Sequence, residues 1–384
     1  MSWEENTLSH LCYKVTDGTH DSPKSIISGF PYIKGTHVKD GLIDFDNCEY
    51  LSEEDHLKVI SRSKPEKGDT LFANIGANLG ECAYVNIDFE FSIKNVALFK
   101  PDDKQLNGRF LYFLLSSSLI QNDIVSRKSG SAQPFLSLKA LRNYKIKYPP
   151  LQTQKRIADI LSAYDDLIEN NLKRIKLLEQ ASQKIYKEWF VNLRFPGHEN
   201  TTINQETGLP EGWEEKALGE FTEIKKGKNI TKSTIKEGNV PVVAGGLKPA
   251  YYHNTSNTSN PVITVSASGA NAGYVNMYLE DIWASDCSYI DSNLSDSVFF
   301  IHNLLLNQQE LIFGMQRGAA QPHVYPKDLK RAEFVIPYKG LIQKFEEQVS
   351  AQYDMKRVLL NQNQKLKAAR DILLPRIMNR TIEV

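Results

Sequence analysis

The sequence lacks a long apolar stretch. A membrane span needs roughly 18 consecutive apolar residues, and the longest apolar run, residues 110–115, is followed at once by three serines. The first five residues, Met-Ser-Trp-Glu-Glu, contain two acids and no apolar segment typical of a secretory signal. We therefore expect a cytoplasmic protein without a membrane segment.

Cysteine is also scarce. The four cysteines, Cys12, Cys48, Cys82 and Cys287, lie far apart, and none forms a Cys-x-x-Cys pair. Zinc sites and dithiol redox sites need such close pairs. The eight histidines show no paired metal-ligand spacing either. We expect no metal site, and we expect the cysteines to be reduced and structural.

Charge of one sign is not in excess. Lys plus Arg and Asp plus Glu each number 46, which excludes a polybasic tail protein and an acidic disordered chain. A local patch for nucleic acid remains compatible with this balance. Residues 1–150 hold 18 basic and 19 acidic residues, and residues 211–337 hold 11 and 14. Tight DNA binding therefore needs either strongly segregated charges or a partner that supplies most of the phosphate contacts.

Motifs of DNA-modifying enzymes are missing. The Asn-Pro-Pro-Tyr/Phe loop of adenine methyltransferases does not occur, because the nearest string, residues 148–151 (Tyr-Pro-Pro-Leu), lacks the amide and the final aromatic ring. No Gly-x-Gly-x-x-Gly follows a strand-like run, and Gly227-Lys228 is not preceded by the glycine of a phosphate-binding loop. We therefore expect no catalytic residue and no cofactor site in this chain.

The chain repeats itself at an offset of about 190 residues. Residues 130–134 (Gly-Ser-Ala-Gln-Pro) return as residues 318–322 (Gly-Ala-Ala-Gln-Pro), and residues 76–80 (Gly-Ala-Asn-Leu-Gly) return as residues 269–273 (Gly-Ala-Asn-Ala-Gly). Trp3-Glu4-Glu5 parallels Trp213-Glu214-Glu215. Because the matches keep the same order in both halves, we interpret the chain as a duplication.

Each half ends in a stretch without Gly or Pro, residues 151–193 and residues 341–374. Apolar residues in the first alternate steps of four and three from Ile157 to Trp189, which is the seam of a coiled coil. The second stretch is weaker, and we expect Pro375 to kink or end its helix. Asn171 and Asn363 fall at or near the seams, where asparagine either fixes helix register or is tolerated at a wet position.

These patterns predict an α+β protein in five parts: a mixed domain at residues 1–150, a central helix at 151–192, a linker at 193–210, a second mixed domain at 211–337 and a distal helix at 338–384. We expect the two helices to cover each other's apolar stripes. Two mixed domains, which we call heads, joined by a helical spacer are suited to binding an extended partner at two places.

Polar loops that contain glycine carry side chains able to read nucleic acid. Arginine pairs with guanine, glutamine pairs with adenine, and lysine contacts phosphates. The candidates in the first half are Asn78, Arg127, Lys128, Ser131 and Gln133. Those in the second half are Lys225, Lys226, Lys228, Tyr251, His253, Asn271, Arg317 and Gln321. The alternative for each is an ordinary hydrophilic loop, and the Gly-x-Ala-Gln string in both halves favours the DNA-binding interpretation for Gln133 and Gln321.

The chain resembles the specificity subunits of type I restriction–modification systems over its whole length. Residues 148–157 (Tyr-Pro-Pro-Leu-Gln-Thr-Gln-Lys-Arg-Ile) resemble the family's exit from the first recognition domain. Residues 187–192 (Lys-Glu-Trp-Phe-Val-Asn) and 370–378 (Arg-Asp-Ile-Leu-Leu-Pro-Arg-Ile-Met) resemble the ends of its two helices. Gly212-Trp213 and residues 17–20 (Asp-Gly-Thr-His) also fit, whereas residues 337–341 depart from the usual Pro-Pro-Leu-x-x-Gln form.

The resemblance implies two α/β target-recognition domains, each reading one half of a split double-stranded DNA site. It implies two long antiparallel coiled-coil helices that act as a ruler and as a dock for two modification (methyltransferase) subunits. Those partners bind S-adenosylmethionine and methylate adenine, and restriction motor–nuclease subunits join them for cleavage. Two other hypotheses stay open at this point: a fused restriction or methyltransferase enzyme, and a coiled-coil assembly protein that does not read DNA.

Overall fold

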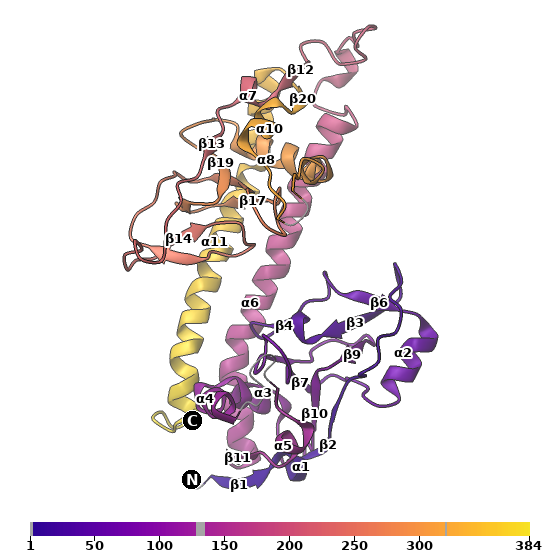
Figure 1. Cartoon of the computed structure of the whole chain (residues 1–384), viewed down its shortest axis with the longest axis vertical. Helices are drawn as coiled ribbons and strands as arrows, with labels where there is room; N and C mark the ends of the chain where they lie inside the picture. The colour runs from indigo at the N-terminus through magenta and orange to yellow at the C-terminus, as the bar shows by residue number, and fades with distance from the viewer. Residues whose placement is uncertain (1–2, 128–134, 319–320) are drawn as a thin grey trace. The chain divides into compact units, whose positions relative to one another are not determined.

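The computed structural model describes residues 3–127, 135–318 and 321–384 (Figure 1). It divides into two compact units. Unit 1 comprises Met1–Asn170 and Gln362–Val384, and unit 2 comprises Asn171–Asn361. Each unit therefore contains one mixed head and one part of each long helix, and each is described by itself.

The head of unit 1 is built on two main sheets. One has the order β2-β10-β7-β8 and is antiparallel, and the other has the order β6-β3-β9, with β3 and β9 parallel. The strands are β2 (Cys12–Asp17), β3 (Phe30–Lys34), β6 (Glu49–Leu51), β7 (Thr70–Phe72), β8 (Cys82–Tyr84), β9 (Ser92–Lys94) and β10 (Ala97–Pro101). Small pairs are formed by β1 (Glu4–Thr7) with β11 (Lys145–Tyr148) and by β4 (Val38–Lys39) with β5 (Leu42–Ile43).

Short helices cover these sheets. They are α1 (Leu8–Leu11), α2 (Glu53–Ile60), α3 (Gly108–Ser116), α4 (Ser118–Arg127) and α5 (Leu138–Arg142). The longest apolar run of the sequence forms α3, whose Asn107 cap accepts a hydrogen bond from the Phe110 N–H (3.0 Å). Residues 110–115 are all buried, so this run is core rather than membrane-facing surface.

Unit 2 repeats this plan. Its four-stranded sheet has the order β13-β19-β16-β17, its three-stranded sheet the order β15-β14-β18, and β12 pairs with β20. The strands are β12 (Glu214–Ala217), β13 (Lys225–Lys226), β14 (Val240–Val243), β15 (Tyr251–His253), β16 (Val262–Ser266), β17 (Val275–Tyr278), β18 (Trp283–Ala284), β19 (Cys287–Asp291) and β20 (Glu333–Ile336). Its short helices are α7 (Leu218–Phe221), α8 (Val298–Asn307), α9 (Gln309–Phe313) and α10 (Pro326–Arg331).

The equivalence of the heads confirms the predicted internal repeat. In both, the first strand of the head pairs antiparallel with the strand that precedes a long helix, Glu4 opposite Tyr148 and Glu214 opposite Ile336. Both four-stranded sheets place the strands in the same spatial order, and both three-stranded sheets contain one parallel pair. The α+β class predicted from the sequence is likewise observed.

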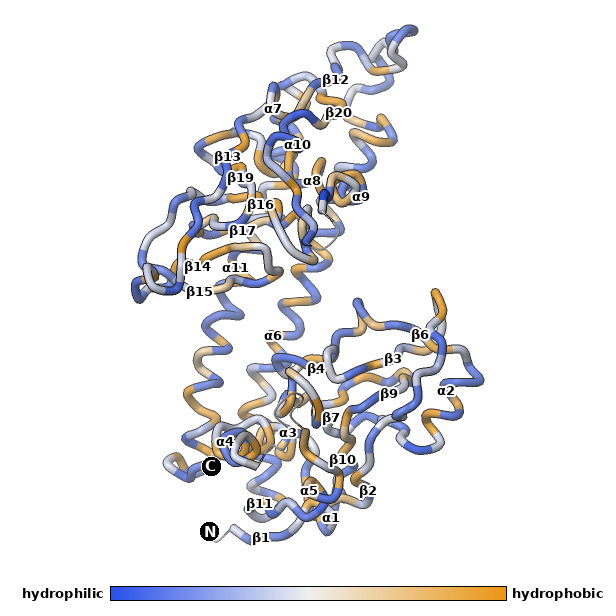
Figure 2. The backbone as a smooth tube through the Cα atoms, viewed as in Figure 1, coloured by the Kyte–Doolittle hydropathy of each residue, from blue (hydrophilic) through white to orange (hydrophobic). Residues whose placement is uncertain are grey.

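The long helices are α6 (Leu151–Tyr186) and α11 (Lys339–Met378), and a five-residue π-helical segment, Lys187–Val191, follows α6. Figure 2 shows apolar and polar residues alternating along both. In unit 1 the start of α6 packs with the end of α11 in one core, which contains Ile157, Leu161, Leu374 and Ile377. In this unit Asn363 Nδ2 lies 3.5 Å from the Ile168 carbonyl.

In unit 2 the end of α6 packs against the start of α11. Tyr186 stacks edge-on against Phe345 with ring centroids 6.0 Å apart, and Lys356 Nζ lies 2.7 Å from Glu179 Oε1. Rising numbers in α6 meet falling numbers in α11, so the pairing within each unit is antiparallel. Although the sequence pattern of this second stretch is weak, four of its residues are buried in unit 2: Phe345, Val349, Tyr353 and Lys356.

The structure adds detail to two sequence expectations. Pro375 does not end α11, which continues to Met378. A proline removes one N–H donor and crowds the carbonyl four residues earlier. Here the turn after it still forms, because the Asn379 N–H donates to the Pro375 carbonyl (2.9 Å), and Ile377 and Met378 are buried in the core of unit 1. The expected linker at residues 193–210 is partly folded, because Phe195 is buried against Trp213 and Leu341.

Within the described ranges, no helix is both long enough and apolar enough to cross a membrane.

Candidate functional site

Four loops of unit 1 meet at one edge of its sheets, where β3 and β9 end side by side (Figure 1). We call these loops, residues 17–20, 34–37, 75–80 and 93–96, loop face 1. The N–H groups of Gly18 and Thr19 donate to the carbonyls of Val96 and Ile93 (both 3.0 Å). The Asn78 side chain donates to the Gly35 carbonyl (3.1 Å). Backbone bonds thus fix this edge of unit 1.

Unit 2 builds the same edge from residues 226–229, 243–246, 268–273 and 284–287, which we call loop face 2. The Gly227 N–H donates to the Cys287 carbonyl (2.8 Å), and the Lys228 N–H donates to the Ala284 carbonyl (2.9 Å). A Cβ atom on Gly18 or on Gly227 would lie 2.1 Å from a carbonyl oxygen, that of Ile93 or Ser285. Only glycine permits this close approach. Both loop faces therefore contain a glycine packed against the backbone of a neighbouring loop.

The repeated Gly-Ala-Asn turns occupy equivalent places. Both end in glycines with positive φ, +99° at Gly80 and +87° at Gly273. The Asn271 amide points to the Gly245 carbonyl (3.4 Å), just as the Asn78 amide binds Gly35. Each of the two asparagines proposed for DNA binding therefore uses its side-chain amino group to hold a neighbouring loop. Their contact with DNA stays a prediction.

The lysine loop of unit 2 borders loop face 2. Lys225, Lys226 and Lys228 are all exposed, and none forms an ion pair with any described residue. Lys225 and Lys226 are successive residues of the edge strand β13, opposite Tyr289 and Ser288. Successive side chains of a strand point to opposite faces, so these two lysines cannot contact the same phosphate. Lys228, in the loop after the strand, is the best placed of the three.

The aromatic candidates divide in two. Tyr251 is 42% exposed on β15 and can stack on a base. His253 is only 6% exposed, and its Nδ1 accepts a hydrogen bond from the Lys236 N–H (3.0 Å). Its ring packs edge-on against Trp283 with centroids 5.1 Å apart. This burial does not favour the predicted contact of His253 with DNA, because its ring is almost fully covered.

Arg317 and Gln321 lie beside the Gly-Ala-Asn turn of loop face 2. Arg317 and His323 exchange two backbone hydrogen bonds (2.9 and 2.8 Å), and the Gly269 N–H donates to the Pro322 carbonyl (3.0 Å). Gln321 is exposed. Arg317 is 62% exposed although Nη2 binds Asp328 Oδ1 at 2.8 Å. The structure thus brings Arg317, Gln321, Asn271 and Lys228 to one edge of unit 2.

Four candidates of the first half cannot be placed in this way. Lys128, Ser131 and Gln133 lie outside the described residues, and Arg127 is described only as the last residue of α4. The chain that follows returns beside loop face 1, where Ile75 bridges to Phe135 as Ser268 bridges to His323 in unit 2. The DNA-binding roles of these four residues remain predictions.

Sequence reasoning missed side chains that meet only in the fold. On loop face 1, His20 Nδ1 lies 2.8 Å from Asn95 Oδ1, and on loop face 2 the Ser268 hydroxyl donates to Asp286. The first pair is 75 residues apart in sequence and the second 18, so neither forms a local motif. The sequence signal that accompanies the first pair is the Asp-Gly-Thr-His string at residues 17–20.

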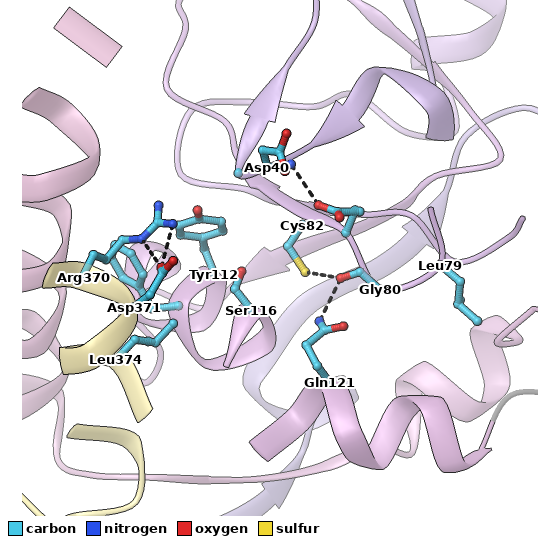
Figure 3. Close-up of a pocket in the computed structure, with 13 residues that line it drawn as sticks. Asp40, Leu79, Gly80, Cys82, Tyr112, Ser116, Gln121, Arg370, Asp371 and Leu374 are labelled. Carbon is cyan, nitrogen blue, oxygen red and sulfur yellow. Dashed lines mark hydrogen bonds and ion pairs between the residues drawn. The ribbon is translucent and has the colours of Figure 1, made fainter. Parts of the chain in front are cut away.

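A cleft of about 280 Å³ lies within unit 1, between the head and the end of α11 (Figure 3). Figure 3 shows Arg370 directed at Asp371 and the Gln121 amide directed at the Gly80 carbonyl, which it binds at 2.8 Å. Arg370 also binds Asp165. Because its cation is engaged by two carboxylates, the cleft is poorly suited to a phosphate-bearing ligand. Among the described residues no group of His, Cys, Asp or Glu is arranged to hold a metal ion.

Comparison with known proteins assigns the family. The model of the type I restriction modification DNA specificity domain matches this chain twice, at residues 3–180 and 210–365. These two matches cover each head and most of each long helix.

Three relatives illustrate the similarity. The chain is 26% identical over 297 residues to the type I restriction enzyme MjaIX specificity subunit of Methanocaldococcus jannaschii, covering 71% of this chain and 68% of the relative. It is 22% identical to the HindI specificity subunit of Haemophilus influenzae, over 98% of this chain and 99% of the relative. The EcoBI specificity subunit of Escherichia coli is 32% identical, but only over 46% of this chain and 38% of its own length.

The crystal structure of a type I restriction–modification S subunit from M. genitalium has the same fold. It aligns over 98% of this chain and 96% of its own, with a TM-score of 0.58 and 16% sequence identity. Together with the two family matches, these similarities show that the chain belongs to the type I restriction–modification specificity subunits, which recognise DNA and are not themselves catalysts.

Proposed function

We propose that each loop face binds one half of a bipartite double-stranded DNA target. The proposal rests on one observation. Loop face 1 and loop face 2 are built from equivalent backbone hydrogen bonds, while the side chains on them differ. A constant frame with variable side chains is what a protein needs to read two unlike half-sites. Arg317, Gln321 and Lys228 on the edge of unit 2 offer guanine, adenine and phosphate contacts.

The proposal includes partners. The relatives are named as subunits of restriction enzymes, and we propose that two modification subunits dock on the long helices and that restriction motor–nuclease subunits join them. In unit 1, Ile160 and Leu167 lie a heptad apart on α6 and are 40% and 45% exposed, as expected of a helix face that another helix covers. S-adenosylmethionine belongs to the modification subunits in this scheme, and the complex works in the cytoplasm, where it reaches chromosomal DNA.

The experiment is footprinting with the reconstituted complex of this chain and its modification subunits. We expect two protected segments separated by an unread spacer on duplexes selected from a random pool. Protection without sequence preference would contradict the proposal. A second arm tests the isolated chain for transfer of labelled methyl groups to DNA, where we expect none; transfer would favour the fused-enzyme hypothesis.

A further inference from the structure

Asn95 and Asp286 occupy the same position on the two loop faces. Asn95 lies between β9 and β10, and Asp286 lies between β18 and β19. The residues around them make equivalent bonds, since Val96 and Cys287 accept from the glycines of the neighbouring loop while Ile93 and Ala284 accept from the residue after each glycine. Both side chains are partly exposed. One position thus carries an amide in unit 1 and a carboxylate in unit 2.

Each of these side chains is held at one end. In unit 1, Asn95 Oδ1 lies 2.8 Å from His20 Nδ1, and because a carbonyl oxygen can only accept, the ring nitrogen is the donor. His20 Nε2 lies 3.0 Å from Asp17 Oδ2, and because a carboxylate can only accept, both ring nitrogens of His20 act as donors here. Asp17 also binds Arg62. Three polar side chains therefore orient the Asn95 amide, whose Nδ2 group is left without a hydrogen-bond partner among the described residues.

In unit 2 a hydroxyl takes the place of the histidine. The Ser268 hydroxyl donates to Asp286 Oδ2, and the backbone carbonyl of Asp286 accepts from the Ala267 N–H (3.1 Å). Asp286 Oδ1 has no hydrogen-bond partner among the residues that the structure describes. The free end of the side chain is thus an acceptor in unit 2 and a donor in unit 1.

The Asp17 carboxylate is buried and needs its partners for folding, but the bond from His20 to Asn95 is not needed in the same way. His20 is 55% exposed, and bonds between exposed polar groups contribute little to stability because water replaces them readily. An orienting relay is useful when the side chain at its end must meet a partner at a fixed angle. Asn95 also has a left-handed backbone, with φ at +52°, which fixes its direction from the loop.

We infer that Asn95 and Asp286 read equivalent base positions in the two half-sites with opposite hydrogen-bond polarity. The Asn95 amide donates to a major-groove acceptor, such as guanine O6 or N7 or thymine O4, and Asp286 accepts from the amino group of cytosine N4. His20 and Ser268 are positioning residues that select which end of each side chain faces the DNA. The inference rests on the proposed function.

The test exchanges the amide and the carboxylate at these two positions. Asn95→Asp and Asp286→Asn complexes, each with the modification subunits, are assayed for methylation of a duplex library randomised at every target position. We expect Asn95→Asp to change the preferred base at one position of one half-site by about tenfold or more, toward cytosine. Asp286→Asn should change one position of the other half-site, away from cytosine. Asn143→Asp and Asp103→Asn, which make the same chemical changes at exposed residues away from the loop faces and the long helices, should leave both half-sites unchanged.

A second variant pair tests the positioning role. His20→Ala should weaken discrimination at the Asn95 position alone, and His20→Gln, whose amide can still donate to Asn95 Oδ1, should restore part of it. Asn95→Ala should lose discrimination there without gaining a new preference. If folded Asn95→Asp and Asp286→Asn complexes keep the wild-type preference at every position, this inference is overturned while the proposed function stands. If the wild-type complex itself shows no bipartite preference, the proposed function fails first.

Discussion

Arg370 Nη1 lies 2.5 Å from Asp165 Oδ1, across the seam between α11 and α6 in unit 1. The Tyr112 hydroxyl donates to the other carboxylate oxygen (3.3 Å). Burial raises the pKa of the Asp165 carboxyl, and the neighbouring guanidinium opposes that shift. This charged bridge joins the head, the central helix and the distal helix of unit 1, so its loss should be felt in the stability of that unit.

We expect Arg370→Met to destabilise the protein by about 2 kcal/mol, because it leaves a largely buried carboxylate without its cation. The double variant Asp165→Asn with Arg370→Met should recover part of the loss, since neither charge then remains. The matched control is Arg109→Met, which breaks the adjacent pair with the 52% exposed Asp166 and should cost less than about 1 kcal/mol. Urea unfolding measures all three. Equal losses for Arg370→Met and Arg109→Met would contradict the importance of the bridge.

Glu346 in unit 2 gives a pH-dependent prediction. Its Oε1 accepts a hydrogen bond from the Phe300 N–H (2.6 Å), and burial raises its pKa from 4.5 to about 7. Between these two values the folded state holds a proton that the unfolded state releases, so the wild type loses stability as pH rises from 4.5 through 7. Glu346→Gln has no such loss. We expect the variant to gain about 1–3 kcal/mol relative to wild type between pH 5 and pH 8.

The comparison with the variant is necessary because His302 changes the stability with pH in the opposite direction. Burial lowers the pKa of His302 from 6.5 to about 3, so its contribution to stability is lost as pH falls below 6.5. Both proteins contain His302, and its effect cancels in the difference between them. Thermal unfolding of wild type and Glu346→Gln at each pH gives that difference. A gap that stays constant from pH 5 to pH 8 would show that Glu346 has an ordinary pKa.

The lysine loop of unit 2 should contribute affinity without sequence preference. Lys228→Ala is expected to weaken DNA binding by the complex and to reduce by about one the slope of log affinity against log salt, because one phosphate contact is lost. Lys145→Ala is the control, since that lysine belongs to the β1–β11 pair outside the loop faces. Binding titrations from low to moderate salt provide the slopes. A changed base preference in Lys228→Ala would contradict a purely phosphate-directed role.

Gln321→Ala should relax one position of a single half-site at a cost of about 1–3 kcal/mol. The reason is that a glutamine amide pairs with both major-groove groups of adenine, which alanine cannot replace. Competition binding with single-base variants of the target measures the loss. If affinity and preference are both unchanged, Gln321 is an ordinary loop residue, as the hydrophilic-loop alternative supposes.

The long helices and the repeat were predictable because they depend on local periodicity and on strings repeated in order. The seam from Ile157 onward is an example. The sequence-based predictions failed where tertiary packing determines which residues are buried. His253 reads as an exposed ligand group beside two tyrosines, yet it is buried and packs against the Trp283 ring. Lys356 reads as a surface lysine, but Glu179 compensates its charge at the seam.

The candidate base-reading residues were also only partly predictable from the sequence. Strings such as Gly-x-Ala-Gln are visible in sequence because their residues are adjacent. The pairs His20–Asn95 and Ser268–Asp286 become visible only after strands from distant parts of the head are aligned. Even then, the equivalence of Asn95 and Asp286 follows from backbone hydrogen bonds rather than from any sequence similarity between the loops.

The most direct test of the account is a genome-wide methylation map in cells that carry this chain with its modification subunits, compared with cells that carry an Arg317→Ala, Gln321→Ala double variant. We expect adenine methylation at one bipartite motif for the wild type. For the variant we expect a motif that is relaxed in one half and unchanged in the other. A methylation pattern that does not depend on this chain, or a variant that alters both halves alike, would contradict it.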